Sequence, residues 1–489
     1  MMARKRLRSE DVLAAIQQMN SDSDDSDLES NSGASVASDD DVGSSDRLDN
    51  TDVDDVDCTQ TDDDSDEWRK LSTTANNFTQ LPFSLTNTGF QLSGTDVPED
   101  ETGFFQLFFS DTLFQELAEN TNEYAHVNLS KMQLRARSIW HKWADVTADE
   151  MKAYIAVILN MAMNEKPGVF DYFSKQWVTH MPFFSDIFSR DRFLQIRWML
   201  HVTSSANGNT DKISNMVKHI KSKCMEYFVA GRDIAIDETT VAFKGRAGFK
   251  MYNPQKPTKW GLRIYTLGDS ATGYIVTFEP YYGQKTTESL TRPDLPFTSR
   301  IVIHLVNQLL QETNATGYHL FTDRYYTSCV LAVELLKMNV HLTGTVQRNR
   351  QGLPPELKQK VKLKKHEVIA YATKTVMMLV WLDKRPVYML STFHDASTQQ
   401  IQRRVKGATE TVAKPTVTID YTAKMGGVDR ADHMCTSYSF SRKSVKWWRK
   451  TFFWLLEVSV VNSFFYCITA TKPRVEENKS VTSSIDRIS

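Results

Sequence analysis

The chain has 489 residues, and its 41% apolar content is enough for a sizeable packed core. Five cysteines lie far apart, which excludes a disulfide framework and a CxxC-type zinc site. The net charge of −2 conceals an uneven distribution: residues 21–67 hold 19 acidic residues and one basic residue. The other 442 residues hold 57 basic and 41 acidic ones, so the sequence is an acidic segment joined to a basic body.

The first 103 residues are expected to form a disordered acidic tail and a linker. Residues 21–67 are rich in Ser and Asp and have few large apolar side chains, so they bury too little surface to offset the entropy of ordering. The segment MMARKRLRSED at the start is basic but lacks a following apolar run, so it is not a signal peptide. Its basic residues are compatible with nuclear import.

Residues 104–230 are predicted to be an all-helical domain. Thr147-Ala-Asp-Glu150 precedes an apolar run and has the pattern of a capping box at a helix start. The segment SRDRFLQIRWMLHV, residues 189–202, places Phe193, Ile196 and Leu200 on one side of a helix.

The pattern changes at Asp233 to short strands. Three β-rich runs end near residue 283, and a helix over 300–310, a strand over 319–323, a helix over 329–339 and a strand over 341–346 follow. This order is typical of a ribonuclease-H-like α/β core, with its first part at 231–346 and its second part at 416–470.

Residues 347–415 interrupt that core as a β-rich basic insertion. They contain a predicted hairpin, VMMLVWLD with RPVYMLST, and residues 341–415 hold 14 Lys or Arg against five Asp or Glu. After the insertion the pattern is helical, and residues 471–489 are a polar tail.

One segment, residues 451–471, is apolar and long enough for a membrane span. Glu457, Asn462 and Ser463 lie near its middle, and a charged group there costs roughly 2.5 kcal/mol or more in a bilayer. We therefore expect a buried core helix and no membrane.

Carboxylates stand where the predicted structure changes. Asp237 and Asp323 end predicted strands, and Asp429 and Asp432 lie in GGVDRADHM at a predicted helix start, where positions i and i+3 share a face. If these groups converge they suit a hard divalent ion, although a capping or turn role is the ordinary one for such an Asp. The sequence has no P-loop, no GxSxG and no HExxH, so no competing chemistry is supported.

Several blocks in order resemble the piggyBac family of DNA transposases. They are IDETTVAFKGR (236–246), YNPQKPTKWGLRIYTLGDSATGYI (252–275), FTDRYYTS (321–328), GTVQRNRQGLP (344–354), GGVDRADHM (426–434) and SRKSVKWWRK (441–450).

The resemblance implies that Asp237, Asp323 and Asp429 are the metal-binding catalytic triad and that Asp432 is a fourth required carboxylate. It implies Mg²⁺ or Mn²⁺, strand cleavage and transfer at TTAA sites in double-stranded DNA through hairpin intermediates, and a homodimer in the nucleus.

Two departures from the family pattern bear on these expectations. Arg324 stands where the family usually has Asn, which adds a cation beside the expected metal site. Family members usually end in a Cys/His-rich zinc domain, and this sequence ends at Ser489 without such cysteines, so we expect no zinc in this chain.

Cations and flat rings mark the expected DNA contacts, since phosphates attract the former and unstacked bases stack on the latter. The candidates are Arg246, Lys250, Lys256, Lys259, Arg348, Asn349, Arg350, Lys443, Lys446 and Trp447.

Three functions remain open from the sequence. Retention of all four carboxylates favours an active transposase-type nuclease and strand transferase. Arg324 and the missing zinc domain favour a domesticated DNA-binding or chromatin protein without catalysis. The third alternative is an unrelated metal phosphoesterase.

Overall fold

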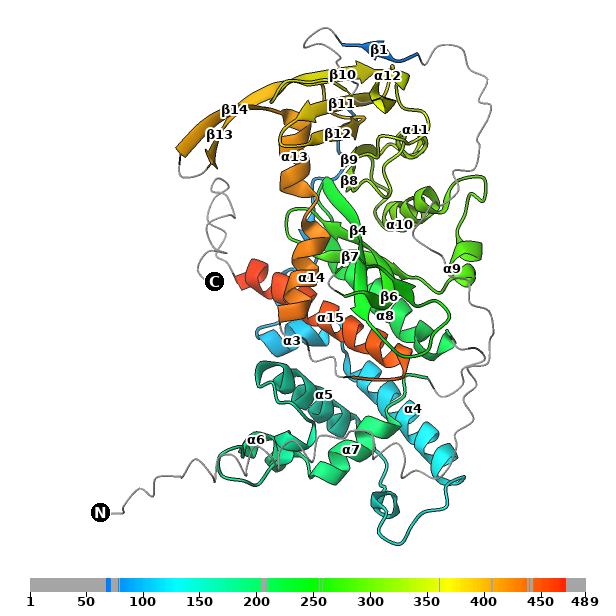
Figure 1. Cartoon of the computed structure of the whole chain (residues 1–489). Coiled ribbons are helices and arrows are strands. Elements are labelled where there is room, and N and C mark those ends of the chain that lie inside the picture. The colour runs from blue at the N-terminus through cyan, green and yellow to red at the C-terminus, as the bar shows by residue number, and fades with distance from the viewer. Residues whose placement is uncertain are drawn as a thin grey trace, which may run out of the picture. The chain divides into compact units, whose positions relative to one another are not determined.

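The computed structural model describes residues 67–71, 78, 80–203, 208, 210–254, 256, 258–359, 361–405, 408–437, 439 and 443–471. The predicted disordered tail, the basic N-terminal patch and residues 472–489 of the polar tail lie outside this part of the chain. The described residues form two compact units (Figure 1). One unit comprises residues 111–212, and the other comprises the described residues of 44–110 and 213–489.

The smaller unit is helical. Thr147 caps α5, because its hydroxyl accepts from the Glu150 N–H at 3.1 Å, and Ser189 caps α7 in the same way through Arg192 N–H at 3.2 Å. In a complete capping box the Glu150 carboxylate would accept from the Thr147 N–H. Here that carboxylate instead binds the Arg192 guanidinium at 2.6 Å. The elements are α4 (Asp111–Leu129), η2 (Ile139–Lys142), α5 (Ala148–Met163), η3 (Phe170–Phe173), α6 (Pro182–Ile187) and α7 (Arg190–Met199).

The stretch predicted as one helical domain, 104–230, is divided between the units. α3 (Glu101–Gln106) belongs to the larger unit, where Phe104 lies 5.2 Å from Tyr466 between ring centroids. Most of α8 (Asp211–Tyr227) belongs there as well.

The larger unit is built on a ten-stranded mixed sheet, which confirms the α/β class. Its order is β1-β10-β11-β12-β9-β8-β4-β6-β5, with β7 also paired to β6. β4 runs parallel to β8, and β8 runs parallel to β9, whereas β6 is antiparallel to both β4 and β7. The first strands are β4 (Asp233–Ala242), β5 (Met251–Tyr252), β6 (Trp260–Asp269), β7 (Ile275–Pro280), β8 (His319–Thr322) and β9 (His341–Thr345).

Helices pack against this sheet. All four residues of β8 are buried, as expected for a parallel strand that is covered on both faces. The helices and remaining short elements are β2 (Gly89–Phe90), η1 (Gly94–Asp96), β3 (Phe228–Val229), α9 (Gln284–Ser289), α10 (Phe297–Thr313), α11 (Cys329–Lys337), α13 (Thr416–Lys424), α14 (Gly427–Ser437) and α15 (Trp447–Thr471).

The predicted insertion is partly an extension of the central sheet. β12 pairs with β9, so the predicted hairpin of β11 and β12 continues the core sheet. β13 and β14 form a separate ribbon (Figure 1), whose Ile401 and Val412 pack in a core with Trp381. The elements are α12 (Pro355–Lys358), β10 (Val368–Ala372), β11 (Met377–Leu382), β12 (Pro386–Ser391), β13 (Thr398–Val405) and β14 (Ala408–Pro415).

Residues expected as a linker instead pack along the larger unit. β1 (Arg69–Lys70) pairs with β10, the Trp68 indole N–H donates to Gly352 O at 2.8 Å, and the Phe90 ring stacks on Tyr466 at 4.0 Å. Apolar and aromatic side chains in this Thr- and Asn-rich stretch therefore supply contacts that its composition did not reveal.

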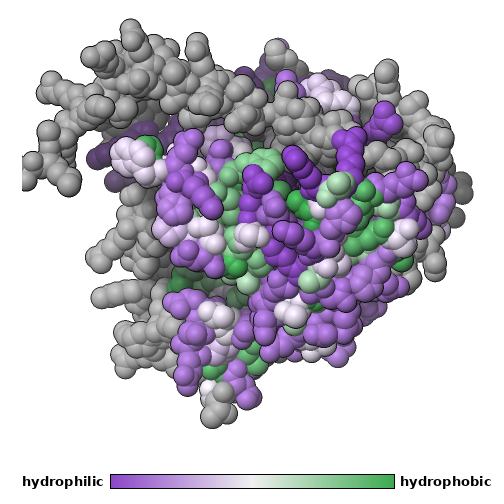
Figure 2. All heavy atoms as spheres, turned by 90° about the horizontal axis from the view of Figure 1, so that it is seen from below, coloured by the Kyte–Doolittle hydropathy of each residue, from purple (hydrophilic) through white to green (hydrophobic). Residues whose placement is uncertain are grey.

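Among the residues that the structure describes, one helix is apolar and long enough to cross a membrane, Trp447–Ala470 within α15, and 72% of its apolar window is buried in the protein. Its polar groups have protein partners. The Asn462 side chain bonds both the N–H and the C=O of Ile275 at 3.0 Å, and Glu457 accepts from the Ser439 hydroxyl at 2.9 Å. On the face drawn in Figure 2, apolar surface occurs as patches between polar side chains.

Candidate active site

Two of the predicted carboxylates are brought together by the parallel pairing of β4 and β8. The register places Ile236 opposite Thr322, so the next residues, Asp237 and Asp323, lie side by side where β8 ends. They are 86 positions apart in the sequence, and only the pairing of these two strands makes them neighbours.

Backbone donors orient both carboxylates. The Glu238 N–H donates to Asp237 Oδ1 at 2.8 Å, and the Tyr325 N–H donates to Asp323 Oδ1 at 2.8 Å. The main chain therefore holds one oxygen of each carboxylate, and the Tyr326 N–H is a second backbone donor to the Asp323 carboxyl.

The α14 helix supplies the other two carboxylates. Asp429 is in its first turn, Asp432 follows one turn later, and the helix packs against β4 and β6. The Thr239 hydroxyl on β4 donates to Asp432 Oδ1 at 2.7 Å, which ties the helix to the strand that carries Asp237.

The second glycine of the Gly-Gly pair before these residues has a steric reason. A Cβ at Gly427 would lie 2.9 Å from the Asp269 carbonyl oxygen, so a larger residue would push the start of α14 away from the turn after β6. Gly427 therefore sets how closely Asp429 and Asp432 approach the sheet.

The site disfavours negative charge as it stands. Burial, followed by the charges of Glu238, Asp323 and Asp429, raises the pKa of Asp237 to about 8. Burial also raises the pKa of Asp323, with Glu238 adding to the effect and Arg324 opposing it. These carboxylates repel one another in a partly desolvated place, and a bound cation would reduce that repulsion.

The pKa of Asp432 is raised as well, but less than that of Asp237. Burial raises its pKa to about 6, the hydrogen bond from Thr239 opposes this, Asp429 adds to it, and Lys256 opposes it. All four predicted carboxylates therefore belong to one electrostatic cluster.

Among the residues that the structure describes, no group of three or more His, Cys, Asp or Glu side chains is arranged to hold a metal ion. Mg²⁺ and Mn²⁺ sites in nucleic-acid enzymes commonly use one or two carboxylates together with phosphate oxygens of the substrate. The neighbouring pair Asp237 and Asp323 fits that need, because burial and the charge of Glu238 raise the pKa of both carboxyls, an effect that a bound cation would oppose.

Sequence reasoning missed Glu238. Its side chain is 12% exposed, accepts from the Tyr326 hydroxyl at 2.9 Å and lies 3.7 Å from Lys256 Nζ. It joins β4, the turn after Asp323 and the segment that carries Lys256. Its position next to Asp237 as a second consecutive acid was the available signal.

Apart from Trp447, the predicted DNA-contacting residues divide into three groups. Lys256 and Arg350 are engaged beside the carboxylates, since Arg350 donates to the Tyr325 carbonyl and Lys256 Nζ to the Glu238 carbonyl. Lys250 and Lys446 are half-buried. The exposed members of the set are Arg246, Lys259, Arg348, Asn349 and Lys443.

Trp447 is the corrected member of the predicted set. It is 3% exposed, and its ring packs edge-on against Phe249 and Tyr282 at centroid distances of 5.0 and 5.6 Å. The prediction that it stacks on DNA bases is wrong for this fold, because core packing occupies the ring. Trp448 is also 3% exposed.

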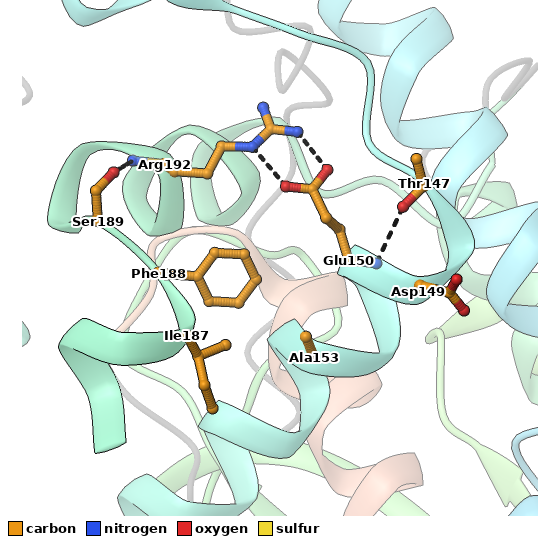
Figure 3. A pocket seen from close by; sticks show the side chains of 8 residues that line it. All are labelled: Thr147, Asp149, Glu150, Ala153, Ile187, Phe188, Ser189 and Arg192. Atoms are coloured by element: carbon orange, nitrogen blue, oxygen red, sulfur yellow. Dashed lines mark hydrogen bonds and ion pairs between the residues drawn. The ribbon is translucent and has the colours of Figure 1, made fainter. Parts of the chain in front are cut away.

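A hollow in the helical unit lies at the starts of α5 and α7 and carries no comparable chemistry (Figure 3). Thr147 and Ser189 cap the helices, and the Arg192 guanidinium is bonded to Glu150 through both Nε, at 2.9 Å, and Nη2, at 2.6 Å. Because Arg192 and Glu150 pair with each other in this hollow, the carboxylate cluster of the larger unit remains the candidate site.

Comparisons with known proteins identify the family and the relatives of this chain. The family model described as Transposase IS4 matches residues 100–464. Human PiggyBac transposable element-derived protein 2 is 26% identical over 379 residues, and human PiggyBac transposable element-derived protein 3 is 25% identical over 379 residues. Each alignment covers 74% of this chain and 60% of the human protein, so the chain spans about three fifths of these relatives.

The fold resembles a solved structure, the cryo-EM structure of a piggyBac transposase synaptic complex with hairpin DNA. The TM-score is 0.67 at 23% sequence identity, and the match covers 80% of each chain.

Proposed function

Since the chain belongs to the piggyBac transposase family, we propose that it cleaves and joins DNA strands at Asp237, Asp323, Asp429 and Asp432. The family generally uses divalent metal ions, and we propose Mg²⁺, or Mn²⁺ in its place, for this chain. The observation that carries the proposal is the pairing of β4 with β8, which sets two partly buried carboxylates side by side.

The carboxylates divide the proposed work. Asp237 and Asp323, oriented by backbone N–H groups, would hold the cation together with phosphate oxygens of the DNA, and Asp429 would complete the set. When bound, a divalent ion would supply a lower pKa for an attacking water and positive charge for the leaving oxygen of a phosphodiester. Asp432 is held by Thr239, and Lys256 beside Glu238 balances negative charge near the cluster.

The strand order supports a ribonuclease-H-like core. β7, β6, β4, β8 and β9 are consecutive neighbours in the sheet, the first three are antiparallel, and the last three are parallel. We propose this core for residues 231–346 and 416–470, with 347–415 inserted between its parts.

The substrate proposal follows the family. We propose double-stranded DNA with TTAA target sites, hairpin intermediates at the ends of a transposon, action as a homodimer and a nuclear location. The exposed cations Arg246, Lys259, Arg348 and Lys443 suit contacts with the phosphate backbone.

A domesticated DNA-binding protein without catalysis is the second candidate. Arg324 favours it, because this exposed cation adjoins Asp323 and its charge opposes the rise in the pKa of that carboxyl. A fixed positive charge at this point competes with a divalent ion for the same carboxylate.

Mg²⁺-dependent nicking and joining of DNA that contains TTAA tests the proposal. Wild type should nick and join the DNA, and Asp323→Asn should lose both activities while still binding DNA. The matched control is Asp186→Asn on α6, an exposed carboxylate of the helical unit, which should behave as wild type.

Two results would contradict the proposal. Nicking that persists in Asp323→Asn removes this carboxylate from the mechanism. DNA binding without nicking in wild type, under Mg²⁺ and under Mn²⁺, establishes the binding-only function instead.

A further inference from the structure

An exposed aromatic pair lies where β5 meets β6. Tyr252 is 46% exposed and Trp260 is 41% exposed, although both rings are large enough to gain from burial. The two residues are directly opposite in the antiparallel pairing, and their ring centroids are 4.5 Å apart with an interplanar angle of 40°.

One cation lies against this pair, and two others are exposed close by in the sequence. Lys250 Nζ lies 4.7 Å from the centroid of the Trp260 ring, and it is held there by a 2.9 Å hydrogen bond to the Gly245 carbonyl oxygen. Lys259, next to Trp260, and Arg246, six residues before Tyr252, are exposed. Flat rings among cations are the combination that binds single-stranded nucleic acid, because bases stack on the rings while phosphates meet the cations.

The pair is related to the carboxylates through the sheet. Thr266 on β6 lies opposite Asp237, and Trp260 is six residues earlier on the same strand, so its side chain leaves the same face of the sheet. Six residues of a strand span about 20 Å, which is about six stacked nucleotides at ~3.4 Å each.

We propose that Tyr252 and Trp260 form a platform on which an unpaired base of the bound DNA strand stacks, about six nucleotides from the phosphate at the carboxylate cluster. Lys250, Arg246 and Lys259 contact the adjoining phosphates. The proposal rests on the proposed function for the identity of the DNA as substrate. It gives to these two rings the stacking role that the sequence suggested for Trp447.

The ordinary role for such a pair is to hold β5 against β6 by cross-strand packing. That role requires the rings for stability and predicts nothing about bases. The two roles therefore predict different results. If the rings stack on a base, removing a ring weakens binding only to DNA that has the base, whereas a purely structural role predicts the same effect with or without the base.

Fluorescence anisotropy of labelled duplexes tests the platform, with the full chain in a chelator so that no cleavage is required. The three DNAs carry a thymine-containing single-stranded gap, the same gap made of abasic residues, or no gap. The variants are Trp260→Ala, Trp260→Phe and Tyr252→Leu. The control is Trp177→Ala, which removes an 84% exposed Trp of the helical unit.

We expect Trp260→Ala to weaken binding of the thymine gap by about 5- to 100-fold, and to leave the abasic gap and the intact duplex unchanged. Trp260→Phe should retain most of the affinity because it keeps a ring. Tyr252→Leu should weaken binding of the thymine gap only, and it keeps the test valid if Trp260→Ala lowers the melting temperature and fails to fold.

Equal losses on thymine and abasic gaps, no loss with either variant, or the same loss with Trp177→Ala would overturn the platform. These outcomes are separate from failure of the proposed function. A chain that nicks DNA yet shows no base-dependent loss keeps the activity without the platform, and a chain that shows the loss without nicking keeps the platform on a non-catalytic DNA-binding protein.

Discussion

Buried ionisable groups lie at both ends of β8, and the two ends differ in how their charges are matched. At its start, His319 is fully buried, its Nε2 lies 2.8 Å from the Thr343 hydroxyl, and the nearby Asp233 is paired with Lys424 at 2.9 Å. Just past its end, Asp323 faces Asp237 and other carboxylates. One end pairs opposite charges, whereas the other gathers like charges.

The histidine end is a network of rings, hydroxyls and ion pairs, in which His319 Nδ1 makes no hydrogen bond and lies 3.6 Å from Asp233 Oδ1. The ring centroids of His319 and His394 are 5.4 Å apart, and His394 Nε2 lies 3.0 Å from Asp420 Oδ2. Burial and the neighbouring cationic groups lower the pKa of His319 well below its ordinary value, so this ring stays neutral. The network links α13 and the segment after β12 to the core strands, which is a structural role.

The comparison teaches that burial alone does not mark a functional group. Satisfied polar clusters specify packing, whereas a cluster of like charges is costly unless a ligand compensates it. The unmatched end is therefore the place where a bound cation would be stabilised.

The largest expected effect separates two aspartates of the same strand. Asp237→Asn should lower the DNA cleavage rate by about 10³-fold or more, because metal-ion stabilisation of transition-state charge is worth several kcal/mol. Asp233→Asn, four residues earlier on β4, should leave cleavage per folded molecule unchanged and lower the melting temperature. Single-turnover cleavage and thermal melts measure both. Equal loss of cleavage in the two variants would contradict the assignment of a catalytic role to one end of β8 and a structural role to the other.

A smaller effect is expected from Thr239→Val, which removes the hydroxyl that donates to Asp432 at 2.7 Å. Groups that hold a ligand in place typically contribute about 10- to 100-fold. Because that hydrogen bond lowers the pKa of Asp432, the pH–rate profile should also move to higher pH. Thr239→Ser keeps the hydroxyl and should retain both rate and profile, and a Ser variant as impaired as the Val variant would assign the effect to packing.

The smallest effect concerns stability without metal, where the two ends should respond to pH with opposite signs. The folded pKa of Asp237, about 8, exceeds the ordinary value of 3.8, so the folded chain binds a proton that the unfolded chain releases, and stability falls as pH rises from about 4 to about 8. The folded pKa of His319 is depressed from 6.5, so stability falls as pH drops below 6.5.

Melting curves across this pH range provide the measurement. Asp237→Asn should raise the melting temperature near pH 8, by roughly 2–4 °C for each kcal/mol of relieved repulsion, and change it little near pH 4. His319→Gln should reduce the loss of stability between pH 7 and pH 5. The opposite result, a higher melting temperature of Asp237→Asn near pH 4 and not near pH 8, would show that the ionised Asp237 carboxylate does not destabilise the folded chain.

Much of the candidate site was predictable. Asp323 after a strand and Asp429 and Asp432 at a helix start were identifiable from periodicity, turn residues and the resemblance, since these features are local in the chain. The prediction that Asp237 ends a strand was wrong, because pairing with β6 continues β4 to Ala242. The fate of Trp447 was not local. A Trp among cations at a helix start reads equally as a base-stacking group or a core residue, and contacts with Phe249 and Tyr282 decide for the core.

The same limit explains the other differences. Residues 68–103 look like a linker by composition, yet β10 and Tyr466 supply partners that hold Trp68 and Phe90 in place. Glu238 looked like an ordinary acid beside Asp237, and only the approach of Tyr326 and Lys256 shows that it joins three segments around the site.

By itself, the sequence determined the order of strands and helices, the four carboxylates and the basic character of the body, because side-chain period, turn residues and charge are properties of neighbouring residues. Tertiary structure alone decided that Asp237 and Asp323 lie next to each other and that Thr239 donates a hydrogen bond to Asp432. It also decided that Trp260 is exposed while Trp447 is buried. These features depend on which strands pair and which helix covers them, and strand pairing joins residues too far apart in the chain for any local pattern to specify.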